Sequence, residues 1–302
     1  MKILKFAALA AIISLPMTVD GRTLQVEKLQ KMELPQEVYC QIPTISPDGS
    51  YVIVGTMGTG TLNKIDLNTG EMSLVAENGD ADALVISPDG RNIVFRNVTF
   101  DKKKMRQTAL HSVNIENGKE TQLVKPSRRL NSGFSVTNSR VSAVESGKMK
   151  KMSISKGDDT VLPVASINYG DLQVTVNGKT NTINPQGEGS YLWPSVSPDG
   201  TKVAYYFVGE GAFVCNLDGS NPQPVGYIHA PRWYGNDMVI GMEDYDDGRV
   251  ITKSSIVASD MLGTHQTLTD ANVKAMYPSA SADGSKIVFS TDEGELYLMT
   301  IK

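Results

Sequence analysis

The chain of 302 residues contains few of the residue types on which most enzyme active sites depend. It has two Cys and three His residues, and it has no Gly-x-Ser-x-Gly nucleophile elbow, which a serine hydrolase of the α/β type requires. A metal site built from imidazoles needs several of them to converge on one point. His111, His229 and His265 are far apart in the sequence and are predicted in different parts of the fold. We therefore expect neither serine hydrolysis nor a metal site built from histidines.

Long apolar runs and an excess of positive charge are also missing. Residues 6–17 form a short apolar run behind Lys2 and Lys5, too short for a membrane span, which needs about 20 apolar residues. This pattern is typical of a signal peptide, so we expect residues 1–21 to be removed and the mature protein to be periplasmic or secreted. A cytoplasmic protein with an apolar N-terminus is the alternative. The net charge of −4 argues against a nucleic-acid partner, which demands a basic face.

What the chain does have is a repeated unit. An apolar run leads into Ser-Pro-Asp-Gly or Ser-Ala-Asp-Gly, and a β-branched or aromatic run follows. Proline presets φ for the first corner of a turn, aspartate can bond its own backbone, and glycine accepts the left-handed conformation that comes next. Strand-forming residues on both sides make each unit a β-hairpin. The four clear copies are residues 44–54, 85–95, 195–205 and 279–289.

The spacing of the units predicts the architecture. The repeated aspartates Asp48, Asp89, Asp199 and Asp283 are separated by 41, 110 and 84 residues, which leaves room for degenerate copies in the two long gaps. We expect these copies at 134–144, with its turn at 137–139, and at 233–240, with its turn at 235–237. A period in the 40s with four strands per unit is typical of propeller blades. The prediction is an all-β, six-bladed β-propeller with four-stranded antiparallel blades, in one domain from residue 22 to residue 302.

The repeat also resembles a known family. The pattern Pro-Ser-x-Ser-Pro-Asp-Gly-x-x-Ile-x-Phe is similar to the PD-type propeller repeat of TolB, which also occurs in prolyl-oligopeptidase-like enzymes and in oligogalacturonate lyases. The resemblance covers residues 36–302 and implies the propeller alone, because the chain has no room for the α/β domain that precedes the propeller in TolB. One fold hosts many activities, so the resemblance implies little about function.

Blade assignment leads to three further expectations. Residues 148–159 and 243–249 are predicted insertions in blades 3 and 5. Residues 23–29 alternate apolar and polar side chains, as a half-buried strand does, and we expect them to complete blade 6, whose fourth strand is missing at the C-terminus. Cys40 and Cys215 are predicted in opposite blades, too far apart for a disulfide, and we expect two buried free thiols.

The best candidate binding surface is aromatic. Matched segments just before the innermost strands of three adjacent blades carry aromatic and Arg side chains, which are enriched in interface hot spots. Packing between blades is the alternative use of such residues, and the sequence leaves both open, with packing favoured for the two tryptophans. The candidate residues at the channel mouth are Tyr39, Tyr191, Trp193, Arg232, Trp233 and Tyr277.

The acidic segment near residue 245 is a weak candidate for binding Ca²⁺, because carboxylates in a glycine-containing turn suit that ion. Its spacing does not match an EF-hand, and a solvated loop that protects an edge strand explains it as well. The acidic residues concerned are Glu243, Asp244, Asp246 and Asp247.

The sequence as a whole predicts an exported, non-catalytic propeller that binds a protein or a cell-envelope ligand through its channel-mouth face. We expect an envelope protein or glycan as partner, a monomeric state, no cofactor and no nucleic acid. The alternative is a metal-dependent propeller lyase acting on an acidic polysaccharide, which the low count of His and basic residues near the channel mouth disfavours.

Overall fold

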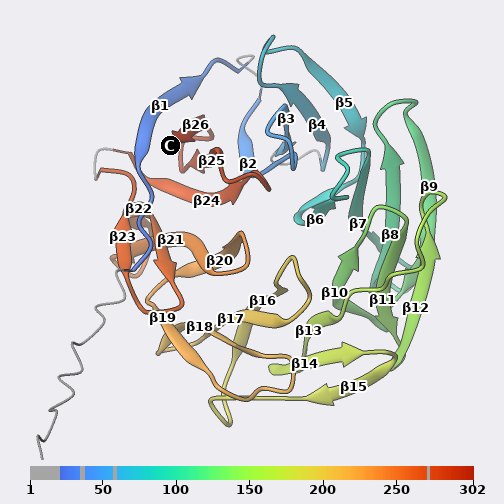
Figure 1. Cartoon of the computed structure of the whole chain (residues 1–302). Coiled ribbons are helices and arrows are strands. Elements are labelled where there is room, and N and C mark those ends of the chain that lie inside the picture. The colour runs from blue at the N-terminus through green and yellow to red at the C-terminus, as the bar shows by residue number, and fades with distance from the viewer. Residues whose placement is uncertain (1–20, 35–37, 57–59, 271–272) are drawn as a thin grey trace, which may run out of the picture.

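The computed structural model describes residues 21–34, 38–56, 60–270 and 273–302. The described residues form 26 strands and no helix, and the strands assemble into seven antiparallel sheets arranged as the blades of a ring (Figure 1). Accordingly, the described residues contain no helix that is long and apolar enough to cross a membrane. The predicted signal peptide, residues 1–21, lies almost entirely outside the described residues.

Four blades are built from four consecutive strands each, with the first strand innermost. Blade 1 is β2 (Cys40–Ile45), β3 (Tyr51–Thr56), β4 (Leu62–Asp66) and β5 (Met72–Ala76); blade 2 is β6 (Asp80–Ile86), β7 (Asn92–Phe100), β8 (Arg106–Asn114) and β9 (Lys119–Ser127); blade 5 is β16 (Tyr191–Val196), β17 (Lys202–Phe207), β18 (Gly211–Asn216) and β19 (Gln223–Gly226); blade 6 is β20 (His229–Tyr234), β21 (Met238–Asp246), β22 (Ile251–Asp260) and β23 (His265–Thr267).

Two blades have only three strands, and they overturn the prediction of six blades. The first half of the predicted insertion 148–159, residues 148–153, forms the third strand of blade 3, and the hairpin at 172–183 belongs to a separate blade 4. The ring therefore has seven blades. Blade 3 is β10 (Leu130–Val136), β11 (Arg140–Glu145) and β12 (Lys148–Ser153); blade 4 is β13 (Val164–Asn168), β14 (Asp171–Val176) and β15 (Lys179–Thr182).

The odd strand number of blade 3 reverses the next inner strand. Ser135 Oγ donates to the carbonyl of Leu162, whereas Ser132 Oγ accepts from the N–H of Ile167, so β13 runs antiparallel to β10. In contrast, β2 and β24 of neighbouring blades run in the same direction. Blade 4 also has three strands, so the chain direction reverses a second time. The inner strand of blade 5, β16, therefore runs in the same direction as the inner strands of blades 1 to 3. This reversal explains why blade 4 lacks the Ser-Pro-Asp-Gly turn: its first turn, at Tyr169 and Gly170, lies on the other face.

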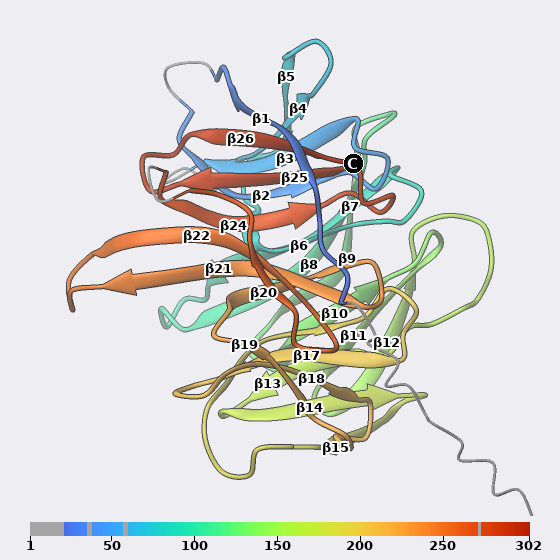
Figure 2. The same cartoon turned by 60° about the vertical axis from the view of Figure 1, so that its left-hand side comes forward.

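Blade 7 is closed by the N-terminal strand, as the sequence predicts. The strand begins three residues later than expected, and it pairs antiparallel with the last strand of the chain along the outer side of the blade (Figure 2). Leu24, just before it, is 5% exposed and belongs to the core between blades 6 and 7. The blade order is β24 (Ala275–Ala280), β25 (Lys286–Thr291), β26 (Leu296–Ile301) and β1 (Val26–Met32).

Each clear copy of the repeat forms the same hydrogen-bonded turn. In blade 1, the buried hydroxyl of Ser46 donates to Asp48 Oδ1 at 2.6 Å and accepts from the N–H groups of Ser50 and Tyr51, both at 3.0 Å. The serine thus satisfies backbone donors that the turn removes from water. We name the face of the ring that carries these turns the turn face. The same Ser–Asp pair, at 2.5–2.6 Å, occurs in Ser87–Asp89, Ser197–Asp199 and Ser281–Asp283.

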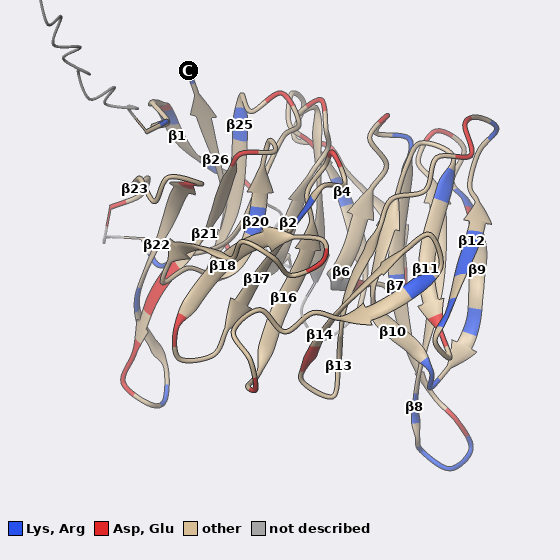
Figure 3. Ribbon diagram, turned by 60° about the horizontal axis from the view of Figure 1, so that its bottom comes forward, with Lys and Arg blue, Asp and Glu red and all other residues tan. Residues whose placement is uncertain are grey.

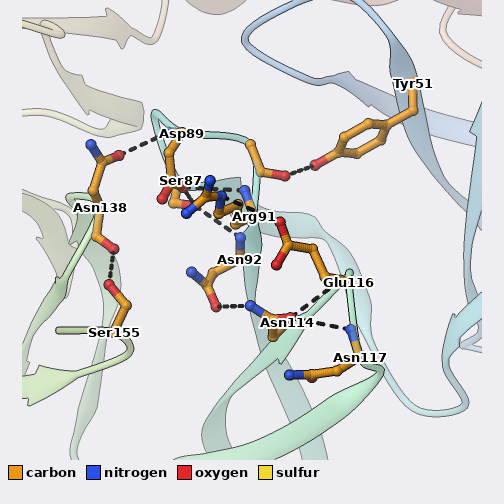
Figure 4. Close-up of polar contacts among 11 residues, drawn as sticks. Tyr51, Ser87, Asp89, Arg91, Asn92, Asn114, Glu116, Asn117, Asn138 and Ser155 are labelled. Atoms are coloured by element: carbon orange, nitrogen blue, oxygen red, sulfur yellow. Dashed lines mark hydrogen bonds and ion pairs between the residues drawn. The ribbon is translucent and has the colours of Figure 1, made fainter.

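The two degenerate copies are confirmed as turns between first and second strands, and they link neighbouring blades. Asn138 in blade 3 accepts a hydrogen bond from the N–H of Asp89 in blade 2, at 2.8 Å (Figure 4). Asn236 in blade 6 accepts the equivalent bond from Asp199 in blade 5, at 3.0 Å. In both degenerate copies an asparagine of the turn therefore joins its blade to the preceding one.

The apolar cores lie between adjacent blades. Blades 6 and 7 share one, which includes Ile240, Ile256, Ile287 and Phe289. Both cysteines are buried and free, as predicted, in blades 1 and 5 of the seven-membered ring.

Candidate functional site

The inner strands of blades 1, 5, 6 and 7 carry a matched irregularity on the face opposite the turn face, which we name the mouth face. In each strand two residues lie opposite one residue of the second strand, forming a β-bulge. The second bulge residue is always proline, which has no N–H to donate to the ladder. The first has a positive φ of 44–53°, a conformation that costs a non-glycine residue about 1–3 kcal/mol. These first residues are Ile42, Trp193, Ala230 and Tyr277.

The bulges correct the alignment of the candidate aromatics. The structurally equivalent positions are those just before the prolines, so Trp193 matches Tyr277, whereas Tyr191 and Arg232 match neither. Bulges re-aim side chains and are frequent beside functional sites. Trp193, at the bulge of blade 5, is 42% exposed.

Trp193 belongs to a cluster of rings at the junction of blades 5 and 6. Its ring centroid lies 5.6 Å from Tyr206 and 5.9 Å from His229, and the ring of Tyr227 lies 5.0 Å from His229. Tyr206 is buried, whereas Tyr227 is 50% exposed. These separations are typical of favourable ring contacts. We name Trp193, Tyr206, Tyr227 and His229 the aromatic cluster.

A hydrogen-bonded chain fixes the centre of the aromatic cluster. His229 Nδ1 lies 2.5 Å from Asp244 Oδ1, and its Nε2 lies 2.8 Å from the hydroxyl of Tyr206. The carboxylate can only accept, so Nδ1 carries a proton, and in the neutral imidazole Nε2 accepts the hydroxyl proton of Tyr206. Burial, followed by the neighbouring Tyr227 hydroxyl, raises the pKa of Tyr206, which keeps that hydroxyl protonated. This series of hydrogen bonds joins β17 of blade 5 to β20 and β21 of blade 6.

The geometry of the aromatic cluster suits binding better than catalysis. Both ring nitrogens of His229 are engaged within the protein, and the side chains of His229 and Asp244 are only 18% and 10% exposed. The rings of Trp193 and Tyr227 are exposed to solvent. Both rings pack against His229, which is held in place by its hydrogen bonds to Asp244 and Tyr206. Rigid aromatic rings of this kind bind apolar or ring-shaped ligand surfaces at a low cost in conformational entropy.

The other candidate aromatics are used in packing. Tyr191 is fully buried, with its hydroxyl accepting from Gln186 N at 2.9 Å, so it is not available to a partner. The indole N–H of Trp233 donates to the carbonyl of Ser195 at 3.2 Å, and the ring packs against the core between blades 5 and 6. The alternative of packing between blades is therefore confirmed for Trp233.

Tyr39 also packs between blades. Its hydroxyl donates to the carbonyl of Asp292, and its ring lies directly against Gly294, where a Cβ would approach it to 2.5 Å. Arg232 and Tyr277 are half-buried in β20 and β24. Of the six candidates, Trp193 alone is counted among the exposed large hydrophobic residues of the described part of the chain.

The acidic residues considered for Ca²⁺ are engaged separately. Asp244 binds His229, whereas Glu243 Oε2 lies 3.4 Å from His265 Nε2. Asp246 and Asp247 each accept backbone N–H groups of their own hairpin, at 2.8–3.0 Å. Within the described residues, no group of three or more His, Cys, Asp or Glu side chains is placed to hold a metal ion.

Three members of the site were not recognised as site residues in the sequence: Tyr206, Tyr227 and His229. His229 has no second histidine near it in the sequence, and its partner Asp244 is predicted as part of the acidic segment. The signal was the turn at 235–237: folding the chain back there brings residues 229 and 244 close together at the mouth face.

Comparison with known proteins supports the architecture and leaves the activity open. No protein-family model matches the chain, and no curated protein matches it. A chain from a crystal structure of the mitotic checkpoint complex is similar in fold, with a TM-score of 0.59 and 13% identity over 99% of this chain and 98% of that one. At this identity the likeness shows the fold alone.

Two solved lyases are similar to a lesser degree. An oligogalacturonate lyase from Vibrio parahaemolyticus is 15% identical, and an oligogalacturonate lyase in complex with manganese is 18% identical. Each comparison covers 86% of this chain and 76% of the lyase, with a TM-score of 0.47. That similarity is too low to assign a reaction to this chain.

Proposed function

We propose that the chain is a non-catalytic binding propeller that captures a protein or cell-envelope ligand through the aromatic cluster at the mouth face of blades 5 and 6. The observation that carries this proposal is the pair of exposed rings, Trp193 and Tyr227, over the chain Tyr206–His229–Asp244. Trp193 stands at a strained bulge, and the polar groups beneath both rings already have hydrogen-bond partners. Both features are typical of a preorganised binding surface.

The charge around the cluster restricts the ligand. The β21–β22 hairpin beside it is net acidic, because it carries Glu243, Asp244, Asp246 and Asp247 against Arg249 and Lys253. Like charges repel, so a strongly acidic ligand is disfavoured there, and a neutral glycan or a neutral to basic protein segment fits best. We further propose that the protein works outside the cytoplasm, after removal of a leader, as a TolB-like propeller.

The test compares binding by paired variants. Immobilised wild-type protein and the Trp193→Ala/Tyr227→Ala variant are exposed to envelope extract and to an array of neutral glycans. The matched control is Phe100→Ala/Tyr169→Ala, which removes two rings that are 67% and 102% exposed elsewhere on the surface. Loss of an aromatic anchor typically costs about 2 kcal/mol or more, so the cluster variant should lose its ligand while the control retains it. Equal binding by all three proteins would contradict the proposal.

A lyase acting on an acidic polysaccharide is the second candidate. The observation in its favour is the Asp–His–Tyr chain, which has the connectivity of a proton relay. The acidic hairpin beside that chain speaks against an acidic substrate. Incubation with polygalacturonate, followed by the ultraviolet absorbance of unsaturated uronate products, tests it: product formation that His229→Gln abolishes would establish the lyase and displace the binding role.

A further inference from the structure

Blade 3 lacks the fourth strand that five of the seven blades possess. Its last strand, β12, pairs with β11 along all six of its residues, from Lys148 to Ser153. Within the described residues no strand lies on the other side of β12. In an antiparallel sheet alternate residues direct their N–H and C=O groups away from the paired neighbour. The outer side of β12 is therefore an open template for another strand.

Charge is segregated toward this edge. Residues 102–156 contain 13 of the 29 Lys and Arg residues but only three of the 33 Asp and Glu residues. This segment thus carries +10, while the rest of the chain carries −14. Figure 3 shows the basic residues in the loop that leads into β8 and along β9 and β12, at the outer side of blades 2 and 3. The net charge of the whole chain conceals this basic region.

The lysines of β12 itself are exposed. Lys150 is paired with Glu145 of the neighbouring strand. Lys148 and Lys151 have no ion-pair partner among the described residues, and both are exposed. Their positive charge is therefore available to a ligand that approaches the edge.

We propose that β12 accepts an acidic, extended peptide segment of a partner protein as the fourth strand of blade 3. Strand addition takes its affinity from main-chain hydrogen bonds, which β12 offers, and its selectivity from side chains, which here favour Asp and Glu. A second copy of this chain is disfavoured, because two β12 strands would place lysines against lysines. A nucleic acid could meet the charge but not the backbone groups of the edge.

The edge of blade 4 gives an internal comparison. Its last strand, β15, has four residues and one lysine, Lys179. It is shorter than β12 and lies outside the basic segment. The proposal therefore concerns β12 alone, and it is independent of the aromatic cluster, which lies in blades 5 and 6.

The experiment uses a fluorescent peptide of alternating Glu and Val that matches the six residues of β12. Binding to the full chain is measured by anisotropy at low and at physiological salt. A second peptide of the same sequence has every backbone N–H methylated, so it keeps the charge but cannot pair as a strand. The unmethylated peptide should bind about tenfold or more tightly than the methylated one, which corresponds to about 1.4 kcal/mol.

Two charge-reversal variants locate the site. Lys148→Glu/Lys151→Glu should weaken binding about tenfold, while Lys28→Glu/Lys179→Glu, which makes the same change in net charge on β1 and β15, should leave it within about twofold. Thermal unfolding of each variant shows that it is folded. Amide hydrogen exchange should show added protection in β12 when the peptide is present.

Three results would overturn the proposal. Equal affinity for the two peptides would show attraction by charge without strand pairing. Unchanged binding by Lys148→Glu/Lys151→Glu would place the peptide elsewhere. Tighter binding of a single-stranded oligonucleotide of equal charge would assign the basic region to a nucleic acid.

Discussion

The hydroxyl of Tyr206 lies 2.8 Å from Nε2 of His229, and this contact joins blade 5 to blade 6 at the mouth face. Asp244 fixes the other nitrogen of the same imidazole. The exposed rings of Trp193 and Tyr227 both lie against this pair. The position of the candidate binding surface therefore depends on a short polar chain between two blades.

Replacing Tyr206 with Phe removes the hydroxyl and leaves His229 Nε2 without that partner. A buried hydrogen bond contributes about 1 kcal/mol net, so we expect the free energy of unfolding to fall by about 1–2 kcal/mol. Urea denaturation measures the change. Tyr245→Phe is the matched control, because that hydroxyl binds Glu243 on a side chain that is 53% exposed, and its loss should change stability little. Similar losses in the free energy of unfolding for the two variants would show that the Tyr206–His229 bond between blades contributes no more than an exposed hydrogen bond.

The Ser–Asp turns predict a dependence of stability on pH. The hydroxyl of Ser46 is the main cause that lowers the pKa of Asp48 below its ordinary value of 3.8, and Ser281 does the same for Asp283. A carboxyl group whose pKa is lower in the folded state stabilises the fold above its unfolded pKa, and that contribution is lost as the pH falls through the folded value. We therefore expect stability to decline from about pH 4 downward.

Ser46→Ala tests this cause directly. It removes the acceptor of two backbone N–H groups, which should cost about 1–3 kcal/mol near pH 7. It also returns the pKa of Asp48 toward its ordinary value, so the difference from wild type should shrink as the pH falls below about 4. Urea denaturation across this range checks both effects, with Ser73→Ala, on the exposed side of β5, as control. A difference that stays constant with pH would contradict the coupling between Ser46 and Asp48.

Closure of the ring predicts that Leu24 is important for stability despite its place near the N-terminus. Leu24 is buried against blades 6 and 7, and its N–H donates to Gln266 Oε1 at 2.7 Å. Leu24→Ala should reduce the free energy of unfolding by about 2–4 kcal/mol, as buried leucines do. Leu29→Ala, at a position in β1 that is 41% exposed, should change it by less than about 0.5 kcal/mol. If the two substitutions had equal effects in chemical denaturation, the N-terminal segment would not complete the ring in solution.

The two thiols should be unreactive in the native protein. Burial raises the pKa of both Cys40 and Cys215 to about 12, so almost no thiolate exists near pH 8, and neither sulfur is accessible. We expect a disulfide-exchange reagent to label no thiol in native buffer and both in denaturant. Fast labelling of one cysteine without denaturant would show that its blade opens locally.

Local patterns in the sequence predicted much of the fold. The Ser-Pro-Asp-Gly hairpins, the degenerate turns at 137–139 and 235–237, and the alternation before residue 30 depend on turn chemistry and on the two-residue period of a strand. Both are properties of short segments, so they can be recognised without knowledge of the rest of the chain.

The blade number could not be derived in that way. Blade 4 has no Ser-Pro-Asp-Gly turn because β13 runs in reverse after the three strands of blade 3. The spacing of the motif is interrupted at this point, so the sequence predicts β12 as part of an insertion, whereas the structure places it in blade 3. The number of strands in blade 3 depends on which strands of the folded chain pair with one another. Such pairing depends on residues far apart in the sequence, so a local pattern does not reveal it.

The sequence by itself determined the all-β architecture and the turn chemistry, because each depends on residues within one hairpin. It also indicated the closing N-terminal strand, through the alternation in residues 23–29 and the fourth strand missing at the C-terminus. The tertiary structure alone decided that there are seven blades, that Tyr191 is buried while Trp193 is exposed, and that His229 meets Asp244 and Tyr206. Burial and contact depend on how neighbouring blades pack and on the bulge before each proline. Those interactions join residues that no local pattern connects.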